Sequence, residues 1–286
     1  MMFDQGGKLN DVYPWCADGR SLRGQEVSIT YSDTLSPASF ALDSLLVRLV
    51  KDQQQRNISV LSLSRPKRHY EAVFRKNGMD LEALKKAGKL DLYVLDMSTS
   101  SSSSSSSSLY KGSEDGTIVD VNIVDSCDDV TSNSNGCWEA IVAWVNSKSF
   151  NTDENATLLV DDLDTLNFVA ISSSSSSSSG SGSAHSIGQN AGVCFLYNLR
   201  SIFNMNPNFL LVTMGCEGVV GGAGCVSVTE YMKESSTLSI SINPLASGYS
   251  SDCHGIIRID YGLRVQLYKY KALDSGIKCV EILNTI

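Results

Sequence analysis

The sequence lacks the features that mark a zinc site, a secretion signal or a membrane span. Its eight cysteines contain no C-x-x-C pair, and its three histidines, His69, His185 and His254, stand apart without metal-ligand spacing. No apolar run approaches the ~18 residues that a membrane-spanning helix needs. The N-terminal stretch MMFDQGGKLND has no apolar signal segment. We therefore expect an intracellular protein with reduced thiols and no membrane contact.

Positive charge is also scarce over the whole chain. Lys and Arg number 23 against 31 Asp and Glu, which gives a net charge of -8 and excludes a globally basic nucleic-acid-binding domain. The distribution is uneven, because residues 65–89 have a local charge of +5 and residues 111–164 one of -10. This asymmetry predicts a basic face and an acidic face on the folded domain, suited to different partners. The alternative is that both segments are solvated surfaces.

Serine, in contrast, is abundant. The chain has 286 residues and 46 serines, of which 17 form two pure runs, Ser100–Ser108 and Ser172–Ser179. Tracts without apolar side chains cannot offset the entropy lost on ordering. We predict serine-rich disordered insertions at about 98–116 and 172–190, within a single domain over 26–286. Residues 1–25, which are polar and contain four glycines, are expected to form a flexible lead-in.

Strand and helix patterns alternate through the first part of the domain. The order β-α-β-α-α-β predicts parallel strands joined by right-handed crossovers. Strands are expected at Val27–Tyr31, Ile58–Leu63, Leu90–Leu95, Ala156–Val160 and Phe209–Met214. Helices are expected from Ser36-Pro37 to Asp52, at Lys67–Asn77 before Gly78, at Asp80–Ala87 before Gly88, and at Val193–Phe203.

The pattern changes at the glycine-rich stretch Met214–Gly224, MGCEGVVGGAG, which is not expected to form a regular element. Beyond it the sequence predicts only short strands, at Leu238–Ile242, Ile256–Asp260, Leu267–Tyr270 and Ile277–Leu283. A parallel α/β half followed by antiparallel strands predicts a RecA-like α/β fold: a mostly parallel central sheet flanked by helices, with a C-terminal antiparallel extension.

The chemistry of a RecA-type nucleotidase is missing from this sequence. Its phosphate loop would lie between the first strand and the first helix, with glycines to expose backbone N–H groups, a lysine for phosphate charge and a Ser or Thr for magnesium. Here that connection, YSDTLSPASF from Tyr31 to Phe40, has no glycine and no lysine, and Asp33 would repel phosphate. We therefore expect no ATP hydrolysis by this chain, no catalytic residues, no bound metal and no cofactor.

An apolar strand that ends in two acids, Thr157 to Asp162, resembles a Walker B strand, whose aspartate holds magnesium in active proteins. Without a phosphate loop, a structural role is the preferred interpretation. Acidic residues at a strand end commonly cap the following turn. Asp161 and Asp162 are therefore candidates for structural residues, with metal binding as the alternative.

Several segments in order resemble one protein family. The most specific is GYSSDCHGIIRI, Gly248–Ile259, with a glycine, an aromatic residue, Asp252, and then Gly255 before an apolar strand. Tyr268–Lys271 (YKYK), Leu158–Leu166 (LLVDDLDTL) and the block Ser59–Asp96 complete the pattern. Over most of residues 26–282, apart from the serine tracts, the chain resembles Elongator complex protein 6, a small subunit of the Elongator tRNA-modification complex.

This resemblance implies a RecA-like fold without a phosphate loop, and an accessory rather than a catalytic role. Members assemble with Elongator complex proteins 4 and 5 into a hexameric ring that binds tRNA and supports modification of the wobble uridine. It implies a cytoplasmic protein, with a nuclear share left open. The candidate tRNA-facing residues are Lys67, Arg68, Arg75 and Lys76. The rival interpretation is a RecA-like or Rossmann-like ATPase or transferase with a degenerate nucleotide site, based on Asp161, Asp162 and the glycines from Gly215 to Gly224.

Overall fold

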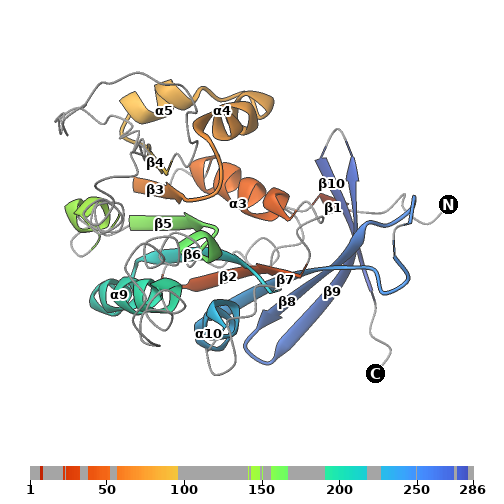
Figure 1. Ribbon diagram of the computed structural model, residues 1–286. Coiled ribbons are helices and arrows are strands. Elements are labelled where there is room, and N and C mark those ends of the chain that lie inside the picture. Colours follow the sequence, from red (N-terminus) through yellow and green to blue (C-terminus); the bar gives the residue numbers. More distant parts are fainter. Residues whose placement is uncertain are drawn as a thin grey trace, which may run out of the picture.

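A single mixed sheet organises the part of the chain that the structure describes. The computed structural model describes residues 7–8, 22, 24–32, 38–51, 57–95, 141, 143–148, 150, 156–166, 191–217, 227–248, 250–273 and 276–282. The strand order is β1-β10-β9-β8-β7-β2-β6-β5-β3-β4 (Figure 1). The predicted serine-rich insertions and the predicted helix cap at Ser36-Pro37 lie outside the described residues.

The predicted parallel half of the sheet is confirmed. Neighbouring strands from β7 to β4 all pair in parallel. Their bounds are β2 (Glu26–Tyr31), β3 (Asn57–Ser62), β4 (Leu90–Val94), β5 (Ala156–Asp161), β6 (Leu210–Cys216) and β7 (Leu238–Pro244). Strand β6 continues into the glycine-rich stretch, so the expectation of no regular element there is wrong for Gly215 and Cys216.

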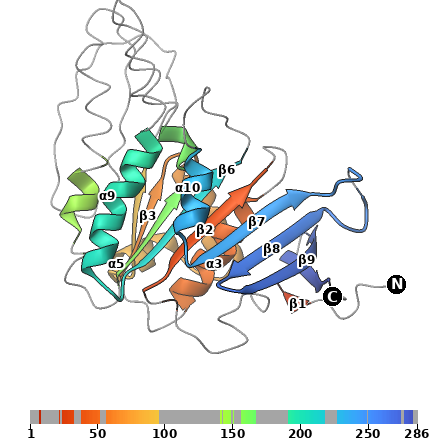
Figure 2. The same cartoon turned by 90° about the horizontal axis from the view of Figure 1, so that it is seen from below.

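Helices cover both faces of this half, with α9 and α10 in front of the sheet and α3 and α5 behind it in Figure 2. In the described segments none is long and apolar enough to cross a membrane. The bounds are α3 (Ser39–Lys51), α4 (Lys67–Lys76), α5 (Leu81–Lys86), α9 (Ala191–Met205) and α10 (Val228–Ser235). Gly78 and Gly88 end α4 and α5 in the left-handed region, with φ of 75° and 64°, as the sequence predicts.

Helix α10 contradicts the expectation that only strands follow the glycine-rich stretch. It spans eight residues and buries Val228, Thr229 and Met232 on one face. Two apolar side chains one turn apart are too weak a periodic signal to be recognised in the sequence. The helix exists because those side chains fill the space over β6 beside α9.

Two hydrophobic cores lie on opposite faces of the sheet because strand side chains alternate between faces. On one face, α3 and α4 bury Leu45 and Phe74 against Ile29 and Val212. On the other, α9 and α10 bury Phe195 and Met232 together with side chains such as Leu158 and Leu211. Consecutive residues of β5 and β6 therefore serve different cores, which explains why these strands are continuous apolar runs.

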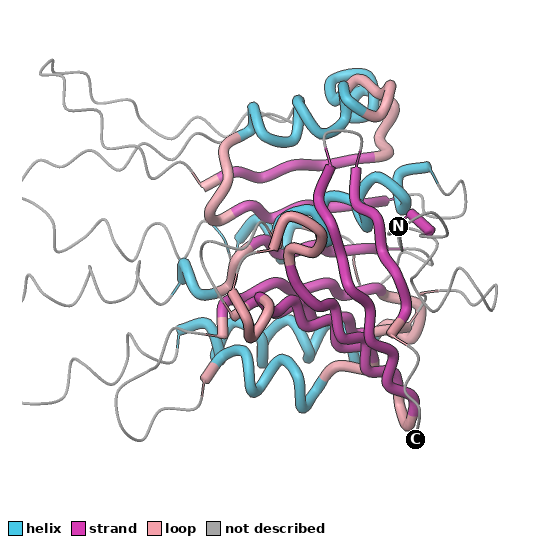
Figure 3. The backbone as a smooth tube through the Cα atoms, turned by 90° about the vertical axis from the view of Figure 1, so that its right-hand side faces the viewer, coloured by secondary structure: helices cyan, strands magenta, loops and turns pink. Residues whose placement is uncertain are grey.

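The C-terminal strands form the predicted antiparallel extension, made of β8 (Gly255–Tyr261), β9 (Arg264–Leu273) and β10 (Gly276–Glu281). In Figure 3 the long antiparallel strands run across the direction of the parallel ones, as the twist of a large sheet requires. Within the expected lead-in, β1 (Gly7–Lys8) pairs with β10, so this part of residues 1–25 is strand rather than flexible chain. The complete arrangement is the predicted one, a mostly parallel central sheet flanked by helices with a C-terminal antiparallel extension.

A substitution of Gly255, the first residue of β8, tests how tightly the antiparallel extension is packed. A Cβ at this position would lie 2.4 Å from the carbonyl oxygen of Asn243 and 2.7 Å from Cε1 of Tyr270. We predict that Gly255→Ala lowers the free energy of unfolding by about 3 kcal/mol, because β7 and Tyr270 must both move. Urea unfolding measures this loss. The neighbouring exposed change Asp252→Ala should stay within about 0.5 kcal/mol of wild type, and equal effects of the two changes would contradict the prediction.

Candidate functional site

The carboxyl ends of β2, β3, β5 and β6 meet at one edge of the sheet, which is where open α/β sheets bind ligands. Tyr31, Ser62, Asp161 and Cys216 lie at these strand ends. The connection that would hold phosphate, residues 33–37, lies outside the described residues. The described polar side chains at this edge form two clusters.

The first cluster, the Arg65 network, surrounds the fully buried Asp161. Tyr70 donates a hydrogen bond of 2.7 Å to Oδ2 of Asp161, and Nε of Arg65 lies 3.4 Å from the same oxygen. Arg65 also pairs with Asp43 of α3 at 3.6 Å, and His69 lies 3.0 Å from that carboxylate. Burial raises the pKa of Asp161, while the guanidinium of Arg65 and the Tyr70 hydrogen bond oppose this shift.

The Arg65 network places a protein cation beside the aspartate that resembles a Walker B residue. An Arg guanidinium cannot be deprotonated in a protein, so it supplies positive charge to Asp161 at all ordinary pH values. Among the described residues, no group of three or more His, Cys, Asp or Glu side chains is arranged to hold a metal ion. Asp161 therefore acts as the buried partner of Arg65 and Tyr70 in this structure.

The second cluster contains the next two acids. Tyr31 donates a hydrogen bond of 2.9 Å to Asp162, and Asp162 accepts the backbone N–H of Asp164 at 3.3 Å. Asp162 adopts a φ of 67°, which an aspartate tolerates in a tight turn. Asp164 accepts the backbone N–H of Cys216. Burial raises the pKa of Asp162, and burial, assisted by the charge of Asp162, raises the pKa of Asp164 to about 7.

Gly215, the first glycine of the stretch on which the rival nucleotide-site interpretation is based, has a packing role. Gly215 lies in β6 directly below α10, and a Cβ there would approach Oδ2 of Asp164 to 3.0 Å and Cγ2 of Thr229 to 3.1 Å. A side chain would push α10 away from the sheet. Residues 218–226, which contain the other glycines, lie outside the described residues.

The predicted tRNA-facing residues lie on α4, next to β4 at the far end of the sheet from β1 (Figure 1). Arg68, Arg75 and Lys76 are exposed, and helical spacing places them on one side of the helix. Lys67 differs, because its Nζ lies 2.8 Å from Glu82 of α5 and 3.6 Å from Glu71. Lys67 thus joins α4 to α5, and the other three residues form the exposed cationic surface.

The segment Gly248–Ile259, on which the sequence resemblance mainly rests, lies in the β7–β8 connection and β8. Gly248 has a φ of 84°, in the left-handed region that favours glycine. Gly255 allows the close approach of Asn243 and Tyr270. Asp252 is exposed, and its backbone N–H donates to the hydroxyl of Ser250 at 3.3 Å. The two glycines thus have structural reasons to be glycine.

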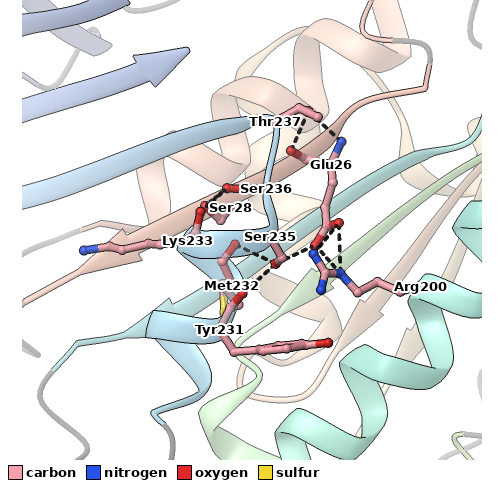
Figure 4. Close-up of polar contacts among 9 residues, drawn as sticks. All are labelled: Glu26, Ser28, Arg200, Tyr231, Met232, Lys233, Ser235, Ser236 and Thr237. Atoms are coloured by element: carbon pink, nitrogen blue, oxygen red, sulfur yellow. Dashed lines mark hydrogen bonds and ion pairs between the residues drawn. The ribbon is translucent and has the colours of Figure 1, made fainter. Parts of the chain in front are cut away.

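Sequence reasoning missed one buried ion pair, at the amino end of β2 (Figure 4). Glu26 is 4% exposed, and Arg200 of α9 reaches both of its carboxylate oxygens at 3.1–3.2 Å. The guanidinium of Arg200 lies 4.8 Å from the ring centroid of Tyr231. Burial raises the pKa of Glu26, and Arg200 and the Ser235 hydroxyl oppose the shift. A groove of about 420 Å³ opens above the pair. Its lining comes from β2, α9 and α10: Glu26, Tyr197, Arg200, Ser201, Asn204, Tyr231 and Ser235.

Comparisons with known proteins identify the fold only. No family model and no curated protein matches the sequence. The KaiC-like protein PH0186 from Pyrococcus horikoshii is 11% identical over 90% of both chains, with a TM-score of 0.47. The uncharacterized protein PH0321 from the same archaeon, crystallised with an unknown peptide, is 11% identical over 93% of this chain and 95% of its own, with a TM-score of 0.53.

The Arg65 network makes a prediction about stability. Arg65→Met leaves Asp161 buried without its cation, so the free energy of unfolding at neutral pH should fall by about 3 kcal/mol. The loss should shrink as the pH falls, because protonated Asp161 needs no cation. Urea unfolding at several pH values measures both effects. Lys67→Met, which removes an exposed ion pair, should cost at most about 1 kcal/mol, and an equal cost for the two variants would contradict the prediction.

The raised pKa of Asp164, about 7, predicts a pH dependence of stability opposite in sense to that of an aspartate whose pKa is lowered on folding. Between the unfolded pKa of about 4 and the folded value, the folded state binds more protons than the unfolded state. The free energy of unfolding therefore falls as the pH rises through this window, by up to about 4 kcal/mol from this one group.

Asp164→Asn keeps an acceptor for the Cys216 N–H and removes the titration. The free energy of unfolding of this variant minus that of wild type should be larger near pH 8 than near pH 5, by about 2–4 kcal/mol. Exposed Asp252→Asn is the matched control and should leave the pH profile unchanged. A parallel pair of pH profiles for wild type and Asp164→Asn would show that Asp164 titrates normally.

Proposed function

We propose that the chain is a non-catalytic RecA-like subunit of the Elongator complex, assembled with Elongator complex proteins 4 and 5 in a hexameric ring that binds tRNA. In this proposal the ring supports wobble-uridine modification that another subunit catalyses, and this chain uses no cofactor of its own. It acts in the cytoplasm, with a nuclear share left open. Two kinds of observation support the proposal: the resemblance of the sequence and the side-chain contacts at the carboxyl edge of the sheet.

One observation supports the non-catalytic role above the others: Nε of Arg65 lies 3.4 Å from Asp161 at the edge where this fold would bind a nucleotide. A catalytic member needs its strand-end aspartate free for magnesium. Here that aspartate is engaged by Arg65 and Tyr70, and the connection after β2 contains no glycine or lysine from Ser32 to Ser39. The loss of the sequence motif and the occupied aspartate point the same way.

RNA binding is supported by the exposed cations of α4. Arg68, Arg75 and Lys76 have no ion-pair partner among the described residues, whereas Lys67 is held by Glu82 and Glu71. Unpaired surface cations can release counterions from a phosphate backbone. Within the proposed ring, α4 therefore contributes a phosphate contact, and Lys67 supports the helix pair behind it.

Co-expression with the two sister subunits tests the assembly. Stoichiometric recovery of all three chains, with the native mass of two copies of each, is the expected result. The isolated chain should show no ATP turnover above that of an Asp161→Ala variant. Nucleotide binding and turnover by the isolated chain, without recovery of the sister subunits, would instead favour the degenerate ATPase or transferase.

A second variant tests the α4 surface within the ring. Changing Arg68, Arg75 and Lys76 to glutamate should weaken tRNA binding and lower the salt slope of log K by about three units, one per contact, while the ring stays assembled. The charge-preserving variant R68K/R75K/K76R is the control and should retain the slope. If the glutamate variant breaks the ring, α4 is a subunit interface; if it binds tRNA unchanged, α4 does not face RNA.

A further inference from the structure

A row of lysines crosses the antiparallel extension. Lys271 of β9 lies directly opposite Lys278 of β10 in the strand register. Lys8 of β1 is the register partner of Lys278 on its other side, so three consecutive strands place lysine at the same level. Lys269 precedes Lys271 by two residues on β9, which places both on the same face of the sheet. Strands β9 and β10 follow each other in the chain, whereas β1 comes from its N-terminal part.

The face that bears Lys269, Lys271 and Lys278 is the one opposite the core. Tyr268, Tyr270 and Cys279 alternate with these lysines and are buried. The ring of Tyr270 packs 5.0 Å from that of Phe40, on the α3 side. Lys269 is exposed, and Lys271 and Lys278 are half-buried. In Figure 1 the antiparallel strands extend to one side of the molecule, away from helices α4, α5 and α9.

The chain does not neutralise this row within its described residues. Neighbouring strands lie about 4.8 Å apart, so directly opposed lysines repel and destabilise the pair of strands. Asp260, on the same face of β8, is already bound by Arg258 at 2.8 Å. Glu281 lies on the other face, directly opposite Tyr268 in the strand register. Burial, and next the charge of Glu281, raises the pKa of Tyr268 to about 12. Unpaired like charges in a chain of net charge -8 indicate an external anion.

The kind of anion follows from what accompanies the lysines. Protein interfaces are depleted of lysine and enriched in aromatic residues at their centre, and single-stranded nucleic acids need aromatic side chains for base stacking. The tyrosines of β9, Tyr268 and Tyr270, are buried on the core side. Lysine binds phosphate as a point charge. We propose that the face formed by Lys269, Lys271 and Lys278 binds the phosphate backbone of double-helical RNA without reading its sequence.

This inference deepens the proposed function, on which it rests for the choice of RNA over DNA, and it adds a second contact surface. The lysine row lies at the β1 end of the sheet, whereas α4 lies next to β4 at the opposite end. The two surfaces are therefore changed by separate variants. Assembly with the sister subunits is measured independently of RNA binding, so that each proposal can fail alone.

The test uses the full chain and an RNA duplex of arbitrary sequence, about 16 base pairs long. Binding is titrated between about 50 and 200 mM salt for wild type and for K269Q/K271Q/K278Q. The glutamine variant should lose about three units of salt slope and at least about tenfold in affinity at the low-salt end. K269R/K271R/K278R keeps the charge and should keep the slope.

A second readout is independent of RNA. Because the lysines repel one another, the glutamine variant without ligand should melt about 2 °C higher than wild type. If the triple variant does not fold, the single change of exposed Lys269 to Gln still predicts a loss of about one slope unit. An unchanged slope in the glutamine variants overturns the inference. So does loss of the sister subunits with unchanged RNA binding, which would make the face a protein interface while the ring remains supported.

Discussion

The burial of a carboxylate at the end of β5 is the constraint on which the carboxyl edge of the sheet depends. Asp161 is fully buried, and a buried charge is tolerated only when it is paired and hydrogen-bonded. Arg65 and Tyr70 engage one oxygen of Asp161, Oδ2, and both come from the chain immediately after β3. Arg65 in turn reaches Asp43, so that α3, α4 and β5 are fixed to one another around a single side chain. The position and angle of α4, and with it the exposed cations, follow from this arrangement.

At the opposite edge of the sheet, where the strands have their amino ends, a second buried carboxylate is also paired with an arginine. Glu26 opens β2 at the amino end, and Arg200 of α9 pairs with it while stacking over Tyr231 of α10 (Figure 4). Ser235 of α10 adds a hydrogen bond of 3.2 Å. Each buried carboxylate thus joins two helices to a central strand, one pair on each face. These two networks explain the packing of the helices against the sheet, although Oδ1 of Asp161 and one terminal nitrogen of Arg65 are buried without a hydrogen-bond partner.

The sequence predicts most strands and most helices because local signals specify them. Apolar runs end in strong stops such as Gly78 and Gly88, and the family segment around Gly255 falls where a close strand approach excludes a side chain. Helix α10 is not predictable in this way, since its burial depends on α9 and on the space above Gly215. The ion pair of Glu26 with Arg200 joins positions 174 residues apart, and the alignment of Lys271 with Lys278 depends on a register that alternation alone does not fix.

The charge layout follows from these constraints. The acids at the strand ends are engaged by Arg65, Tyr31 and the backbone, so they do not require further cations at the carboxyl edge. Among the described residues, the cations without an ion pair include those of α4 and of the β9–β10 face, which lie toward opposite ends of the sheet, and also Lys51, Lys86 and Lys89. A net charge of -8 opposes indiscriminate binding of polyanions, so each cationic surface alone would be weak and sensitive to salt. Repetition of such surfaces around a ring would raise the effective concentration of the second and later contacts. Weak, spaced patches on an acidic chain are therefore physically consistent with the proposed subunit, whose RNA affinity would rise on assembly.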